Sequence, residues 1–117
     1  MRSVNHISTM KPRIFLASLL VLSATGHAFA QESSDLADLV KASGCLSCHS
    51  VQEKIVGPAF KDVAAKYAND ADAVSSLAQS VKNGSRGKWG RIPMPAHASI
   101  STEDLTTLTT WVMSHKP

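Results

Sequence analysis

Gly44-Cys45-Leu46-Ser47-Cys48-His49 is the most informative run in the chain. Its two cysteines are the only ones in 117 residues; they stand three positions apart, with a histidine directly after the second. Two thiols at this spacing on one helical turn can each add across a vinyl group of haem, and the adjacent histidine then lies beneath the iron. The C-x-x-C-H pattern therefore predicts one covalently attached c-type haem, held by Cys45 and Cys48, with His49 as an axial ligand.

Three other origins of the cysteine spacing are open. A disulfide or thioredoxin-like redox pair belongs in a βαβ context, and no alternating hydrophobic run indicates strands here. A zinc site needs two further ligands, and no second Cys or His pair stands at finger spacing. The third is a chance match of five residues. The export signal and the small core described next both favour haem.

The N-terminus has the layout of a secretory signal peptide. The first 13 residues contain three basic side chains and no acidic one, and residues 14–24 are apolar or small without interruption. This run is shorter than the ~20 residues that span a bilayer. Ala28 and Ala30 place small side chains where signal peptidase requires them. We therefore expect cleavage after Ala30, with no membrane span in the mature chain, and Gln31 gives no indication of a lipidated N-terminus.

The excess positive charge belongs to this signal segment. The whole chain has 12 Lys and Arg against 9 Asp and Glu, a formal charge of +3, and three of the basic residues precede residue 31. Residues 31–117 are therefore formally neutral, which removes the main support for nucleic-acid binding. A hydrophobic share of 44% excludes a disordered chain, and two cysteines are too few for a disulfide-built miniprotein.

The remaining chain reads as all-α, because apolar residues recur at helical spacing between breakers. Helices are predicted over 34–43, from Pro58, from about Asp70 to Asn83, and from Ser101, where Asp104 three positions on suggests a capping box. Their apolar faces are Leu36, Leu39 and Val40; Phe60, Val63, Ala64 and Tyr67; Val74, Leu77, Ala78 and Val81; and Leu105, Leu108 and Val112, with Trp111 beside them. So small a core favours a stabilising cofactor, and the long loop over residues 85–100 suggests a function.

The sixth position of a haem iron has one strong candidate. Met94 lies in the long loop between Pro93 and Pro95, which limit its backbone freedom and can hold a thioether in place. His97 is the rival ligand, three residues on, and would give a bis-histidine iron. Met113, near the end of the last apolar face, is expected to be a core residue.

These residues resemble the small periplasmic class I cytochromes c, and more narrowly the short group associated with nitrite reductase and terminal oxidases. The resemblance covers essentially all of residues 31–117. Besides the C-x-x-C-H run, it rests on three segments in the same order: Val56-Gly57-Pro58-Ala59-Phe60-Lys61-Asp62-Val63-Ala64-Ala65-Lys66-Tyr67, Lys82-Asn83-Gly84-Ser85 and Trp89-Gly90-Arg91-Ile92-Pro93-Met94-Pro95.

The resemblance implies a cytochrome c fold of four or five short helices around one haem. By that resemblance, Cys45 and Cys48 carry the thioethers, and His49 and Met94 bind the iron. The Pro58 carbonyl would accept a hydrogen bond from the histidine ring, and Trp89 would donate its indole N–H to a haem propionate. One position departs from the family: His97 stands where an Asn often hydrogen-bonds near the ligand sulfur, which leaves the potential and the stereochemistry at sulfur open.

Two axial ligands from the protein leave the iron no site for a substrate, so the expected function is a one-electron carrier and not an enzyme. The resemblance places it in the periplasm, as a monomer, between respiratory or denitrification proteins such as a nitrite reductase or a terminal oxidase. A haem enzyme, or a redox or gas sensor with a displaceable sixth ligand, is the alternative.

Four basic residues surround the Met94 loop without an acidic one among them. Between Val74 and Glu103 the charged residues are Lys82, Arg86, Lys88 and Arg91. They form either an ordinary solvated surface or a docking rim that steers acidic partners and weakens with salt.

Overall fold

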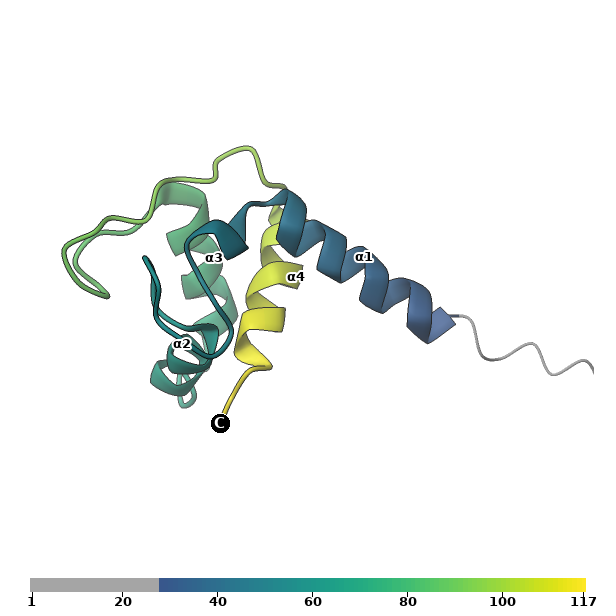
Figure 1. Cartoon of the computed structure of the whole chain (residues 1–117), viewed down its shortest axis with the longest axis horizontal. Coiled ribbons are helices and arrows are strands. Elements are labelled where there is room, and N and C mark those ends of the chain that lie inside the picture. The colour runs from purple at the N-terminus through teal and green to yellow at the C-terminus, as the bar shows by residue number, and fades with distance from the viewer. Residues whose placement is uncertain (1–27) are drawn as a thin grey trace, which may run out of the picture.

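The computed structural model describes residues 28–117. The predicted signal peptide, residues 1–30, lies outside the described residues apart from its last three. In chain order the elements are α1 (Ala28–Ala42), the 3-10 turn η1 (Cys45–Ser47), α2 (Phe60–Lys66), α3 (Ala73–Asn83) and α4 (Thr102–Met113) (Figure 1). Extended pairing in this part of the chain is limited to one isolated bridge between Ser85 and Met94. The all-α class predicted from the sequence is therefore confirmed.

Helix α4 is the centre of the packing, since α1, α2 and α3 all contact it. Figure 1 shows α2 and α3 together on one side of α4. The C-terminal end of α1 lies against α4, and the N-terminal end of α1 points away from the other helices. The buried apolar side chains are Val40, Ala59, Phe60, Val63, Ala64, Ala73, Leu77, Leu105 and Leu108. Most of them come from the predicted apolar faces. This thin core lies mainly between α2, α3 and α4.

The helix starts differ from the predicted ones where local side chains or neighbours intervene. Helix α1 begins at Ala28 instead of 34, because the residues between have no helix breaker. Ala59, directly after Pro58, is extended, so α2 begins only at Phe60. The Asp70 carboxylate accepts the Asp72 N–H at 2.8 Å, a turn that delays α3 to Ala73.

The start of α4 follows the prediction. The Ser101 hydroxyl oxygen accepts the Asp104 N–H at 3.0 Å, which caps the helix. The same hydroxyl donates to the Asp104 carboxylate at 2.8 Å, so the acid contacts the cap through its side chain. No helix in the described part of the chain combines the length and apolar character needed to cross a membrane.

The long loop after α3 is closed by backbone hydrogen bonds. Ser85 donates to the Met94 carbonyl at 3.0 Å and Met94 donates back at 2.9 Å. The His97 N–H donates to the Val81 carbonyl at 3.0 Å, which ties the next residues to α3. Gly84 makes the return possible: its φ is +76°, and a Cβ there would lie 2.8 Å from the Met94 carbonyl oxygen. The loop therefore presents Met94 from a fixed base.

Candidate haem-binding site

One cavity gathers most of the residues singled out by the sequence. It has a volume of about 280 Å³ and is lined by residues between Cys48 and Phe60, by α2 and α3, by residues 85 and 87–95 and by α4. Cys48, His49, Pro58, Trp89 and Met94 all line it. The rival methionine and histidine, Met113 and His97, are not part of its lining, and neither is Cys45.

One ring nitrogen of His49 forms a hydrogen bond within the protein, and the other is available to bind a metal. Its Nδ1 lies 2.8 Å from the Pro58 carbonyl oxygen, which can only accept a hydrogen bond, so Nδ1 carries the proton and donates. The Nε2 lone pair is then free to bind a metal. Phe60 stacks on the ring with centroids 5.1 Å apart, and is itself backed edge-on by Trp111 at 5.1 Å. The orientation of the imidazole is therefore set by the protein.

The chain around the two cysteines is wound tightly. The His49 N–H donates to the Cys45 carbonyl at 3.0 Å, and the Gly57 N–H donates to the Cys48 carbonyl at 2.7 Å. Gly57 therefore lies against the histidine: a Cβ on it would lie 2.8 Å from Nδ1 and 2.9 Å from Nε2. Both cysteines are free, half-buried thiols, and burial raises the pKa of the Cys45 thiol against the opposing effect of a backbone hydrogen bond.

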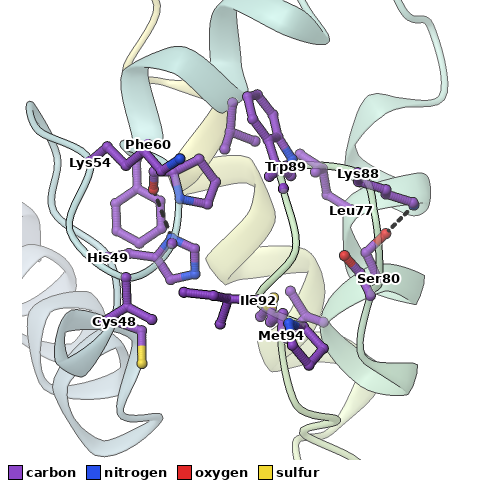
Figure 2. A pocket seen from close by; sticks show the side chains of 18 of the residues that line it. Cys48, His49, Lys54, Phe60, Leu77, Ser80, Lys88, Trp89, Ile92 and Met94 are labelled. Carbon is purple, nitrogen blue, oxygen red and sulfur yellow. Dashed lines mark hydrogen bonds between the residues drawn. The ribbon is translucent and has the colours of Figure 1, made fainter.

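Met94 lines the cavity opposite His49. Figure 2 shows the two side chains on facing sides, one from the segment after η1 and one from the loop after α3. The paired hydrogen bonds between Ser85 and Met94 fix the backbone that carries the thioether. An imidazole nitrogen and a thioether sulfur on facing walls of an apolar cavity are a donor set typical of a haem iron.

Trp89 and Lys66 connect the loop to α2. The Lys66 ammonium lies 4.4 Å from the centroid of the Trp89 ring, and it donates to the Lys88 carbonyl at 3.2 Å. The positive charge of Lys66 is attracted to the electron-rich face of the Trp89 indole, and the hydrogen bond fixes the backbone of Lys88 beside it. Together they hold the indole at the cavity wall.

The charged residues that line the cavity are all basic: Lys54, Lys88 and Arg91. No Asp or Glu is among its lining residues. The rest of the lining is mostly apolar, including Ile55, Val56 and Ile92, whose side chains are 52%, 47% and 68% exposed. A haem combines a broad apolar ring with two carboxylates and an iron that takes nitrogen and sulfur ligands. The apolar lining matches the ring, the basic residues match the carboxylates, and His49 and Met94 offer the nitrogen and the sulfur.

Several contacts in the site were not predicted from the sequence. The close approach of Gly57 to His49, the stack of Phe60 on the same ring and the cation at Trp89 all join segments that come together only on folding. The Gly57-Pro58 pair was part of the resemblance, and Phe60 was predicted as a core residue. Lys54, which lines the cavity, carried no signal beyond its charge.

A family model described as cytochrome c matches residues 34–116. The chain belongs to the cytochrome c family. It is 50% identical over 101 residues to cytochrome c-551 of Pseudomonas aeruginosa, which covers 85% of this chain and 96% of the relative. It is 45% identical over 102 residues to cytochrome c-552 of Nitrosomonas europaea, covering 87% and 92%. The crystal structure of wild-type Nitrosomonas europaea cytochrome c552 superposes with a TM-score of 0.66 at 49% identity, covering 68% of this chain and 99% of that one.

These similarities make this a small class I cytochrome c and confirm the predicted fold. It is an electron-transfer protein and not an enzyme, and it carries one covalently attached c-type haem with iron. Cys45, Cys48 and His49 fit that cofactor, as does the apolar, basic-rimmed cavity beside them.

Proposed function

We propose that this cytochrome is a periplasmic one-electron carrier whose haem iron is bound by His49 Nε2 and Met94 Sδ, with thioethers at Cys45 and Cys48. The observation that carries the proposal is the placement of His49 and Met94 on facing walls of one cavity, with His49 Nε2 free because Nδ1 donates to Pro58. When bound, the haem supplies an iron that alternates between ferrous and ferric states.

The surrounding residues suit a carrier. Two protein ligands leave the iron no position for a substrate, and a Met ligand in apolar surroundings disfavours the ferric charge. Pro58 and Phe60 hold the imidazole, and Ser85 holds the Met94 backbone, so both ligands keep their positions when the iron changes charge. Trp89 lines the same cavity, where its indole N–H would donate to a haem propionate.

An absorption spectrum tests the ligand assignment. We expect the ferric protein to show the weak far-red band of sulfur bound to iron, and Met94→Ala to remove it. Met113→Ala is the matched control, since Met113 does not line the cavity and its loss should leave the band unchanged. Loss of the band through Met113→Ala would refute the assignment, as would a high-spin wild-type spectrum or ready binding of cyanide or CO.

The partners are proposed to be acidic redox proteins that dock at the cavity mouth. The exposed apolar side chains of Ile55, Val56 and Ile92 line the cavity, and so do Lys88 and Arg91. Together with Lys82 and Arg86, which precede them in the chain, these two basic residues form what we call the basic rim. Such a surface attracts acidic partners at long range and forms small, transient interfaces. A nitrite reductase or a terminal oxidase with an acidic docking face is the expected kind of partner.

Ionic strength tests the basic rim. The rate of electron transfer to a purified nitrite reductase or terminal oxidase should fall as salt increases, and Arg86→Gln with Arg91→Gln should lower the low-salt rate and flatten its salt dependence. Lys41→Gln, on exposed α1, is the control for the loss of charge elsewhere. A rate indifferent to salt, or an equal effect of the control, would remove the rim from the proposal.

The predicted export and the monomeric state have direct tests. The mature protein from the periplasmic fraction should begin at Gln31 by mass spectrometry. Sedimentation should give the mass of one chain with one haem. A mature protein that retains residues 1–30, or a stable dimer, would contradict these parts of the proposal.

A further inference from the structure

The charges in the cavity wall are unbalanced within the described chain. Its three charged lining residues are Lys54, Lys88 and Arg91, and no carboxylate lies among the lining. A cation at the edge of an apolar cavity is stabilised by an anion beside it. A haem bound here would bring two propionates as counter-anions, and one or more of the three cations would then face them.

Lys88 differs from the other two because its ammonium is held in place. Lys88 Nζ, from the loop after α3, donates to the hydroxyl oxygen of Ser80 in α3 at 2.8 Å, as the dashed line in Figure 2 shows. The Ser80 hydroxyl in turn donates to the Ser76 carbonyl at 2.9 Å, so its oxygen is oriented to accept from the lysine. Neither Lys54 nor Arg91 makes a side-chain hydrogen bond to the described part of the chain.

The held ammonium keeps donors to spare. An ammonium group has three N–H donors, and the contact to Ser80 uses one. No Asp or Glu of the described residues forms an ion pair with Lys88. Ser80 and Lys88 line the cavity together with Trp89, the residue next to Lys88 in the loop. A carboxylate at this part of the wall would therefore meet a positioned cation beside the indole.

We propose that Lys88, positioned by Ser80, is the counter-charge for one haem propionate. By favouring the ionised propionate, Lys88 would set the pH range over which the midpoint potential of the iron depends on pH. This inference rests on the proposed haem orientation with Trp89 at a propionate. It gives Lys88, an exposed residue that lines the cavity, a role toward the cofactor that is distinct from the proposed docking role of Lys82 and Arg86. Lys88 binds the cofactor, and Ser80 is a positioning residue.

The midpoint potential of the holoprotein, measured against pH from 5 to 9, tests the inference. An opposite charge nearby favours the ionised carboxylate. In Lys88→Gln the propionate should hold its proton about tenfold more tightly. The decrease of the midpoint potential with rising pH should therefore occur about one pH unit higher than in wild type. At alkaline pH the variant should also have a lower potential than wild type, because a positive charge that favours the reduced iron is lost.

Two further variants sharpen the test. Ser80→Ala keeps the charge but removes its anchor, and should move the pH dependence in the same direction by a smaller amount. It also serves if Lys88→Gln fails to acquire haem. Arg86→Gln removes a like charge two positions away that does not line this cavity, and should leave the pH dependence unchanged.

The outcomes separate the inference from the proposed function. If Lys88→Gln and Ser80→Ala both follow the wild-type pH curve while the far-red band persists, the inference is wrong and the ligand assignment stands. An equal shift in Arg86→Gln would also overturn it, because the effect would then be one of net charge. Absence of the far-red band from the wild type would instead refute the proposed ligation.

Discussion

Replacing Gly57 by alanine should damage the haem site from a position that carries no ligand. An alanine Cβ would lie 2.8 Å from Nδ1 and 2.9 Å from Nε2 of His49, whereas ordinary contact begins at 3.4 Å. The Cβ would lie closer still to Cε1 of the same ring, so the imidazole would have to retreat by about one ångström. Its hydrogen bond to the Pro58 carbonyl, 2.8 Å long, and its stack on Phe60 both oppose that movement.

The cost follows from these contacts. Weakening the hydrogen bond costs about 0.5–1.5 kcal/mol, and forcing an extra methyl group into a packed site costs about 1–3 kcal/mol. The free energy of unfolding should therefore fall by about 2–4 kcal/mol. In a domain of this size each kcal/mol lowers the melting temperature by about 4–8 °C, so Tm should drop by about 10–30 °C.

Thermal unfolding of the holoprotein, followed at the haem absorption band, measures the drop. Gly87→Ala is the matched control: Gly87 lies in a loop and lines the same cavity, but no protein atom stands within 4 Å of its Cβ position, so within the chain only the strain of φ +71° is added. We expect Gly57→Ala to lower Tm more than Gly87→Ala and to alter the spectrum of the bound iron. A variant with the Tm and spectrum of wild type would show that the contact with His49 does not restrain the ring.

Three other substitutions address the supports of the site. Gly84→Ala places a Cβ 2.8 Å from the Met94 carbonyl oxygen at φ +76°, and should cost about 1–2 kcal/mol and weaken the far-red band; an intact band would contradict the idea that this turn positions the ligand. Lys66→Met removes a cation–π contact of about 0.5–1 kcal/mol and should speed hydrogen exchange of the Trp89 indole, seen by NMR, a few fold; unchanged exchange would argue against it. Ser101→Ala loses a helix cap, about 1 kcal/mol, and should lower Tm by about 4–8 °C with no spectral change; a spectral change would mean that α4 bears on the site more directly.

The helices were predictable where their apolar spacing and their breakers agree. Leu77, Leu105 and Leu108 lie on faces whose period the sequence shows, and all three are buried. The starts were harder to predict, because they depend on neighbours. Pro58 does not open α2, since the chain stays extended through Ala59 and the Pro58 carbonyl is used by His49.

The centre of the site was predictable because its chemistry is local. The two cysteines and His49 occur within five residues, and Met94 is marked by its flanking prolines. The contacts that orient these groups join residues far apart in the chain, such as Lys66 with Trp89, and no spacing rule reveals them. The sequence therefore predicts the ligand candidates and, through the resemblance, the Pro58 carbonyl beside His49, but not the contacts of Phe60, Gly57 and Lys66 that also hold the site.

The direction of the basic side chains on the surface was likewise not predictable from the sequence. The sequence groups the four basic residues near Met94 as either a solvated surface or a docking rim, because it shows the sign and order of charges but not their direction. In the structure Arg86 and Lys88 are both exposed, but Lys88 lines the cavity with its ammonium bonded to Ser80, and Arg86 does not line it. A charge that is held toward a cofactor acts on the potential, and a charge in solvent acts on encounter rates. These two effects respond differently to pH and to salt, so the basic residues must be tested individually.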